Sequence, residues 1–210
     1  KRKGKDMESV RNCLACLVGC SSVNVNRSLL ARHLDALLPC LYVLDGAVVR
    51  LALRLLTILV VNDDVSFTDI VELSQPPEFH HVERLAALCE ESDELRGGNK
   101  FAVRLLAHFA GRPLSVTAPR EQYAELAKMV GGLKQTSLIS LLPHLLRSAD
   151  PEVVRDAANL AFGMTSDAEV ALLMVKNDLC RSVVDLIAAL PLAELARGQF
   201  AQDPSLAFAA

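Results

Sequence analysis

The sequence predicts an all-α fold that is built from repeated helical units, and three observations support this prediction. Of the 210 residues 51% are apolar, but only 4% are aromatic and none is Trp. Apolar residues recur at helical spacing along almost the whole chain, and no alternating strand pattern competes with them. Finally, one dipeptide, Val-Arg, recurs within four apolar segments. A repeat of this kind indicates a fold that is built from stacked units.

The Val-Arg pairs set the period of this repeat. Their arginines are Arg11, Arg50, Arg104 and Arg155, which are spaced by 39, 54 and 51 residues. Units of helical-repeat proteins are roughly 20–50 residues long, so the spacing fits stacked units with insertions. The four segments are therefore predicted to be equivalent helices.

A second anchor has nearly the same offset. Leu-Leu-Pro occurs at 37–39 and again at 141–143, a separation of 104 residues, whereas Arg50 and Arg155 are separated by 105. Each unit is therefore predicted to contain a Leu-rich helix, a short turn with Asp, and a Val-Arg helix. Asp at a helix cap and Pro in a first helical turn both favour this interpretation.

The stretch from Leu141 to Leu190 resembles an armadillo repeat, a unit of three helices, and is about equally similar to the related HEAT repeat. The resemblance implies a right-handed α-solenoid of about four repeats. We expect one helical-repeat domain over 1–210 that belongs to a longer protein, with a capping helix and tail at 191–210. In this family the long third helix lines a concave groove, where a Trp and an Asn one turn apart often grip an extended peptide.

This sequence departs from the family's groove pattern. The Trp-like positions, four residues after each Val-Arg arginine, hold other side chains, and so do the Asn-like positions one turn later. The former are Ala15, Arg54, His108 and Asn159, and the latter are Gly19, Ile58, Arg112 and Gly163. An importin-like Trp-Asn ladder is therefore not expected.

In the first half of the chain, a helix over 6–19 ends at the polar run 21–24. A Leu-rich helix over 26–44, bent or broken at Pro39, follows it. The next helix, 47–61, is apolar for 15 residues apart from Arg50 and Arg54. A membrane span needs about 20 residues with few charges, so this segment is predicted to be a buried core helix.

The remaining helices are separated by Gly- and Pro-containing breakers at 75–77, 96–99 and 111–113. We expect further helices at 67–74, 78–91, 99–110, 119–130, 134–147, 151–163, 167–176, 178–189 and 191–199. The segment from Asn62 to His81 is interpreted as the displaced first two helices of a unit, with a recognition loop as the alternative.

The recurring arginines are the main functional signal. If the Val-Arg helices stack in parallel, their arginines form a row, and Arg54 lies one turn from Arg50 on the same side. Guanidinium groups bind carboxylates and phosphates through two hydrogen bonds. The candidate partner-binding residues of the concave groove are Arg11, Arg50, Arg54, Arg104, His108, Arg155 and Asn159. The alternative is that each arginine pairs with a nearby carboxylate, for example Arg155 with Glu152.

We therefore expect a non-catalytic protein-protein interaction module that presents its groove to an extended or helical segment, preferably an acidic one. The second hypothesis is a structural scaffold subunit or oligomer that docks by its apolar surfaces inside a larger complex. A formal net charge of −3 disfavours nucleic acid as a partner. No enzyme motif, cofactor signature or small-molecule site is found.

Six cysteines, at 13, 16, 20, 40, 89 and 180, lie within apolar helical stretches and are predicted to be small buried side chains. Cys13 and Cys16 form a C-x-x-C pair, but no second pair completes a zinc site, so no metal is expected. The cysteines favour a reducing compartment, the cytoplasm or the nucleus. The basic start, residues 1–5, is either a nuclear-localisation cluster or an edge of the domain.

Overall fold

A computed structural model of the chain describes residues 2–62, 64–73, 80–90, 92–110, 127, 129–134 and 136–189. These residues form helices and connecting turns, with no strand among them. The predicted all-α solenoid is confirmed. The helices are α1 (Arg2–Cys20), α2 (Asn24–Ala31), α3 (Leu34–Leu37), the 3-10 helix η1 (Leu38–Tyr42), α4 (Gly46–Val61), α5 (Phe67–Glu72), α6 (His81–Ala87), α7 (Asn99–Ala110), α9 (Leu138–Leu145), α10 (Pro151–Met164), α11 (Ala168–Lys176) and α12 (Leu179–Ala189).

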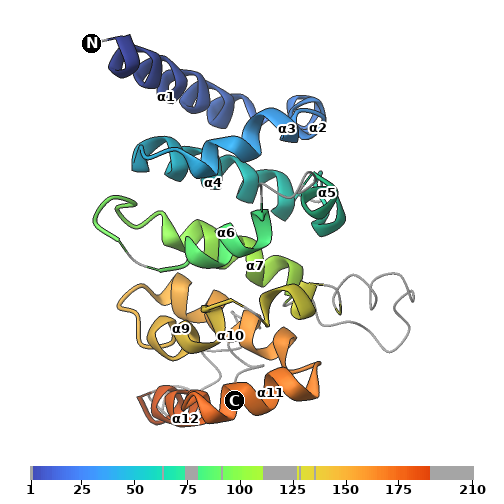
Figure 1. The fold of residues 1–210 in the computed structure, drawn as a ribbon, viewed down its shortest axis with the longest axis vertical. Helices are drawn as coiled ribbons and strands as arrows, with labels where there is room; N and C mark the ends of the chain where they lie inside the picture. Colours follow the sequence, from blue (N-terminus) through green and yellow to red (C-terminus); the bar gives the residue numbers. More distant parts are fainter. Residues whose placement is uncertain are drawn as a thin grey trace, which may run out of the picture.

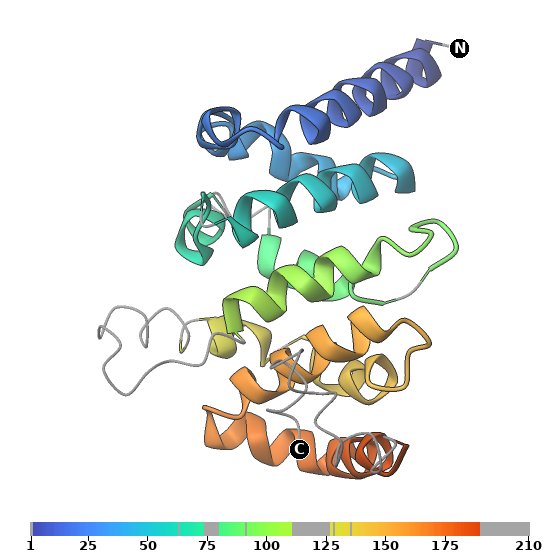
Figure 2. The same cartoon turned by 180° about the vertical axis from the view of Figure 1, so that it is seen from behind.

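The four Val-Arg helices are α1, α4, α7 and α10, and they stack in chain order. Helix α4 packs on α1, α7 packs on α4, and α10 packs on α7. Seen from behind, the four helices lie one below another and run in the same direction (Figure 2). The shorter helices α6 and α9 cover the opposite side, with α11 and α12 at the far end (Figure 1). The predicted parallel stack is therefore present.

Aspartate caps begin several of these helices where the sequence predicts a turn. The Asp45 side chain accepts hydrogen bonds from the backbone N–H groups of Ala47 and Val48, and Asp150 accepts one from Glu152. Asp167 caps α11 in the same way. Such caps satisfy N–H groups that the helix itself leaves without an acceptor, so the bend before each helix is fixed by local chemistry.

The core runs along the stack as a continuous apolar layer. Leucines from α4, α7, α9 and α10 are fully buried in it, together with small residues such as Ala102 and Ala157. One polar side chain links two units inside this layer: Thr57 Oγ1 of α4 donates to the backbone oxygen of Phe101 at 3.1 Å. Each unit therefore buries its apolar face on its neighbours, as stacked repeats require.

The helix predicted over 26–44 is divided differently. It breaks at Arg32 and His33 into α2 and α3, and Pro39 lies in the first turn of η1 rather than at a bend of a longer helix. Pro is tolerated there because the first N–H groups of a helix have no partner within the helix. The predicted helices at 119–130 and 191–199 lie largely or wholly outside the described residues.

The prediction for the cysteines is wrong for most of them. Only Cys89 is buried and Cys40 is half-buried, whereas Cys13, Cys16, Cys20 and Cys180 are exposed and all six are free. Burial raises the pKa of the Cys89 thiol, which keeps it protonated and inert. The first three exposed cysteines lie on α1, whose buried residue Leu14 packs toward α4 and whose outer side is covered by none of the described helices.

None of the described helices combines the length and the low charge that crossing a bilayer requires.

Candidate partner-binding face

The candidate residues all belong to the four Val-Arg helices, which lie on the side of the stack that faces the viewer in Figure 2. The structure brings them together as a series, one set per unit. Their environments differ, however, because the arginines of the repeated position do not have the same neighbours.

Arg11 on α1 is bound to the next unit. Its Nε donates to both carboxylate oxygens of Asp45, at 3.2 and 3.0 Å, and its Nη2 also contacts Oδ2. The hydrogen bond from Arg11 lowers the pKa of the Asp45 carboxyl, and burial opposes this effect. Asp45 is at the same time the cap of α4, so Arg11 holds the start of the neighbouring helix.

Arg104 on α7 makes the equivalent contact with α10. Its Nε donates to Asp156 Oδ2 at 2.9 Å, and its Nη2 lies 3.3 Å from Glu152. Partial burial pulls the pKa of Arg104 down, but the hydrogen bonds and charges of Asp156 and Glu152 outweigh it and raise the pKa. Lys100, one turn earlier, lies 3.7 Å from Glu152 and 4.0 Å from Asp150.

Arg155 shares the carboxylate of Arg104. Its Nε donates to Asp156 Oδ1 at 3.3 Å, and Asp156 is only 7% exposed. Sequence reasoning offered Glu152 as the partner of Arg155, but Glu152 pairs with Lys100 and Arg104 of α7 instead. The alternative interpretation, that the arginines pair with nearby carboxylates, therefore holds for Arg11, Arg104 and Arg155.

Arg50 and Arg54 on α4 are different. Within the described part of the chain neither side chain takes part in an ion pair or a hydrogen bond. Arg50 is half-buried and Arg54 is exposed. A Cβ at Gly98 would lie 3.2 Å from Arg50 Cγ, so the stem of Arg50 rests on a glycine while its guanidinium stays available. These two guanidinium groups lie one turn apart, and neither is held by a carboxylate of the described residues.

His108 and Asn159 continue this line of positions on α7 and α10. Both are half-buried, and the His108 ring contacts the Phe109 ring edge-on, with centroids 6.4 Å apart. They follow Arg104 and Arg155 by one turn, as Arg54 follows Arg50. Arg112, the next position in the series, lies outside the described residues.

A hollow of about 600 Å³ opens beside Arg50. Arg11, Arg50 and Arg96 line it together with Asp45, Asp93 and Glu94, around the start of α4. Arg96 has a φ of +46° and Gly97 a φ of +73°, a conformation that side chains other than glycine rarely adopt. Since three arginines face three carboxylates, the hollow is close to neutral.

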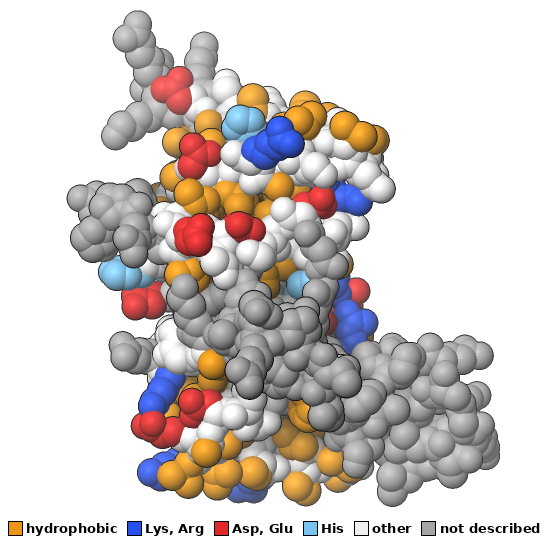
Figure 3. All heavy atoms as spheres, turned by 90° about the vertical axis from the view of Figure 1, so that its right-hand side faces the viewer, with side chains coloured by type: hydrophobic (Ala, Val, Ile, Leu, Met, Phe, Trp, Pro, Cys, Tyr) orange, Lys and Arg blue, Asp and Glu red, His pale blue; other side chains and the backbone are white. Residues whose placement is uncertain are grey.

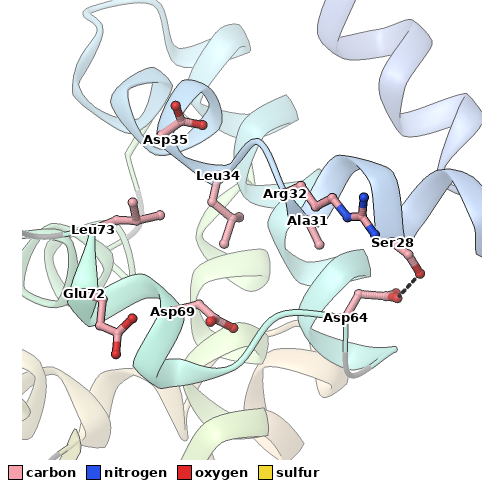
Figure 4. A pocket seen from close by; sticks show the side chains of 9 residues that line it. All are labelled: Ser28, Ala31, Arg32, Leu34, Asp35, Asp64, Asp69, Glu72 and Leu73. Atoms are coloured by element: carbon pink, nitrogen blue, oxygen red, sulfur yellow. Dashed lines mark hydrogen bonds between the residues drawn. The ribbon is translucent and has the colours of Figure 1, made fainter.

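A second hollow, of about 620 Å³, lies at an edge of the stack between α2, α3 and α5 (Figure 4). It is acidic, because Asp35, Asp64, Asp69 and Glu72 line it with Arg32. Asp64 already accepts hydrogen bonds from Arg27 and Ser28, and Asp69 belongs to the capping box of α5. Sequence reasoning missed this hollow, because its carboxylates come from α3, from the turn before α5 and from α5 itself, which only the fold brings together.

Figure 3 looks at the same edge and shows acidic side chains in its upper half and apolar ones at its lower end. Exposed apolar residues of α11 and α12 include Leu172, Val175 and Val184. Among the described residues, no group of three or more His, Cys, Asp or Glu side chains is placed to hold a metal ion.

Comparisons with solved structures bear on the architecture. A designed armadillo-repeat protein, solved in complex with the peptide (KR)4, superposes with a TM-score of 0.60 over 93% of this chain and 75% of its own, at 18% identity. The chain folds as an armadillo-type solenoid. An engineered protein also matches this armadillo-type chain, with a TM-score of 0.61 over 93% of it and 43% of the other, at 20% identity. No family model matches the sequence, and neither does any curated protein.

Proposed function

We propose that this armadillo-type chain is a non-catalytic protein-binding module that holds an extended acidic segment of a partner along its Val-Arg helices. The observation that carries the proposal is the difference between the arginines. Arg11, Arg104 and Arg155 are engaged by carboxylates of the protein itself, whereas Arg50 and Arg54 keep their charge available. A partner carboxylate or phosphate that reaches these two side chains gains charge-assisted hydrogen bonds.

The neighbouring positions support an extended ligand. Arg54, His108 and Asn159 follow one another across α4, α7 and α10, and adjacent helices in such packing lie about 10 Å apart. Residues in an extended chain advance about 3.3 Å each, so one side chain in three reaches successive helices. A repeated donor at each helix therefore suits a peptide that crosses the helices rather than one that lies along a single helix.

The designed neighbour gives a direct comparison, because it was solved with a basic peptide, (KR)4. Since Arg50 and Arg54 are cationic, we expect this chain to have the opposite preference. Fluorescence anisotropy with a labelled peptide of alternating Asp and Glu, and separately with (KR)4, measures both affinities. The acidic peptide should bind, and its affinity should fall as salt is added.

The decisive variant is R50E/R54E. Hydrogen bonds to charged groups are worth about 1.5–3 kcal/mol each, and 1.4 kcal/mol is tenfold in affinity, so the loss should be at least about tenfold. K176E/R181E is the matched control: it reverses two exposed cations, one at the end of α11 and one on α12. Both variants should stay fully helical by circular dichroism. Equal affinity of R50E/R54E and the unaltered chain would reject the acidic ligand.

The second candidate, a structural subunit docked by apolar surfaces, is favoured by the exposed Leu172, Val175 and Val184. Its prediction is different, because such a subunit self-associates when it is purified alone. Light scattering separates the two hypotheses: a peptide receptor is monomeric at micromolar concentration. For either function we propose the cytoplasm or the nucleus, which the free cysteines support.

A further inference from the structure

Helix α1 exposes a side that none of the other Val-Arg helices exposes. Asn12, Cys13, Cys16, Gly19 and Cys20 are all exposed. They lie away from α4, which packs on the opposite side of α1 through residues such as Leu14. We call these five residues the α1 outer face.

The register of α1 matches that of α10, 144 residues later. Their last turns are closed by the same hydrogen bond: Ser21 Oγ donates to the Val18 oxygen at 2.7 Å, and Thr165 Oγ1 to the Phe162 oxygen at 2.6 Å. Identical residues recur along both helices at this offset. They are Asp6, Glu8, Val10, Arg11 and Gly19 in α1, which correspond to Asp150 at the cap of α10 and to Glu152, Val154, Arg155 and Gly163 within it.

In α10 the counterparts of the α1 outer face are buried. They are Asp156, Ala157, Leu160, Gly163 and Met164. Helix α7 covers α10 over most of its length. The closest approach is at Gly163, where an added Cβ would lie 2.0 Å from the backbone oxygen of Ala110. Glycine is thus required at this position of α10 because the end of α7 comes so near.

Gly19 occupies the same position in α1, yet no atom lies within 4 Å of where its Cβ would be. Gly19 lies in the last turn of α1, as Gly163 does in α10, and no contact within the described residues requires glycine at this position of α1. The three cysteines beside it are small and apolar, which suits close packing better than contact with water. Gly19 matches Gly163, and Cys16 and Cys20 are smaller than their counterparts Leu160 and Met164, so this face leaves room for a helix to approach closely.

The hydrogen-bond acceptors match as well. On α10, Glu152 and Asp156 receive Arg104 from α7. The corresponding residues of α1 are Glu8 and Asn12, both exposed. Glu8 keeps the carboxylate, and the Asn12 side-chain oxygen keeps an acceptor for a guanidinium.

We propose that the α1 outer face is a docking surface for a helix of the α7 kind, supplied by another armadillo-type unit. That helix places an Arg or Lys against Glu8 and Asn12 and a small residue against Gly19, and it buries Cys13, Cys16 and Cys20. The interface copies the contact between α7 and α10, which the protein already contains. The proposal is independent of the peptide-binding function, since it concerns the opposite side of α1 from α4.

A tandem chain tests this proposal. Residues 46–149 are copied and joined to Asp6 of the chain, so that a second copy of α7 and α9 precedes α1 as the first copy precedes α10. The copy adds only Cys89, which is buried. Maleimide labelling followed by peptide mass spectrometry gives the reaction rate of each thiol. In the tandem, Cys13, Cys16 and Cys20 should react at least about tenfold more slowly than Cys180, as buried thiols do, whereas in the 210-residue chain all four should react alike.

The variant Gly19→Leu tests whether the thiols are protected by this contact or by another part of the tandem chain. In the tandem it should restore the reactivity of the three thiols, because its side chain occupies the place of the Ala110 carbonyl. In the 210-residue chain it should lower neither the labelling rates nor the melting temperature, since no described contact lies at the Cβ position of Gly19. Thiols that stay reactive in the tandem, or stay protected despite Gly19→Leu, would overturn the proposal. So would a dimer of the 210-residue chain with protected thiols, because the occupant is then a second copy.

Discussion

His81 shows how a single buried polar side chain joins two units. It is the first residue of α6 and only 2% exposed, and its Nδ1 lies 3.1 Å from the hydroxyl of Tyr42 in η1. Arg84 lies over the Tyr42 ring and donates from Nε to the Leu41 oxygen at 2.8 Å. Burial lowers the pKa of His81, and a hydrogen bond with the Leu73 backbone partly offsets the effect.

This pKa makes stability depend on pH. The unfolded chain takes up a proton at His81 near pH 6.5, at about the ordinary value, whereas the folded chain does so only at lower pH. The free energy of unfolding should therefore fall as the pH drops from about 7.5 to 5.5. Urea unfolding at both values measures the loss. His81→Gln keeps a polar group but cannot titrate, so its loss should be smaller; an unchanged loss would assign the effect to other histidines.

At the scale of single helices, the contact between α7 and α10 depends on a missing side chain. Gly163 lets the end of α7 approach to a distance that a Cβ forbids. Gly131 is also helical, but nothing lies within 4 Å of its Cβ position. The two glycines therefore give opposite predictions for one substitution.

Gly163→Ala should destabilise the protein by at least about 2 kcal/mol, because overpacking of a tight contact typically costs 1–3 kcal/mol. Gly131→Ala should be neutral or stabilising by up to about 1 kcal/mol, since alanine favours helix. Thermal and urea unfolding of both variants give the comparison. If Gly163→Ala were as stable as Gly131→Ala, the close approach of α7 to α10 would be wrong.

Helices were predictable from sequence where caps and periodicity agree. The segments expected at 47–61 and 151–163 are α4 and α10 within one residue at each end, because an aspartate cap precedes each of them. The prediction for 26–44 placed the break at Pro39, whereas the structure has it at Arg32 and His33. No Gly or Pro marks Arg32 and His33, so the local sequence gives no signal for the turn at which α2 ends and α3 begins.

Among the described helices, each Val-Arg helix packs mainly on the Val-Arg helix next to it in the stack, so a disturbance at one boundary should stay local. Arg104→Ala removes the cation from the α7–α10 boundary and leaves the buried Asp156 with Arg155 alone. In hydrogen exchange measured by mass spectrometry, α10, α11 and α12 should exchange faster, while α4 stays protected. Arg11→Ala is the counterpart at the other boundary: it should speed exchange at the start of α4 and leave α10 protected, because Arg11 binds Asp45, the cap of α4. Uniformly faster exchange along the chain would contradict this local response.

The candidate face was predictable only as a set of positions. The Val-Arg spacing placed Arg11, Arg50, Arg104 and Arg155 on stacked helices, as the structure has them. Which of them are neutralised depends on carboxylates 34 to 52 residues away, such as Asp45 for Arg11 and Asp156 for Arg104. Sequence periodicity carries no information on such pairs, so the contrast between Arg50 and its equivalents emerged only from the packing.

Two consecutive residues at the start of α4 have a consequence for protein engineering. Asp45 binds Arg11 of the preceding helix, and Gly46 meets the Glu94 backbone oxygen of the segment that leads to α7. These two residues therefore form contacts with both adjoining units. Anyone who recombines modules of this solenoid should transplant it together with Arg11 and the 94–98 segment, since a crossover at that point would mismatch two junctions at once.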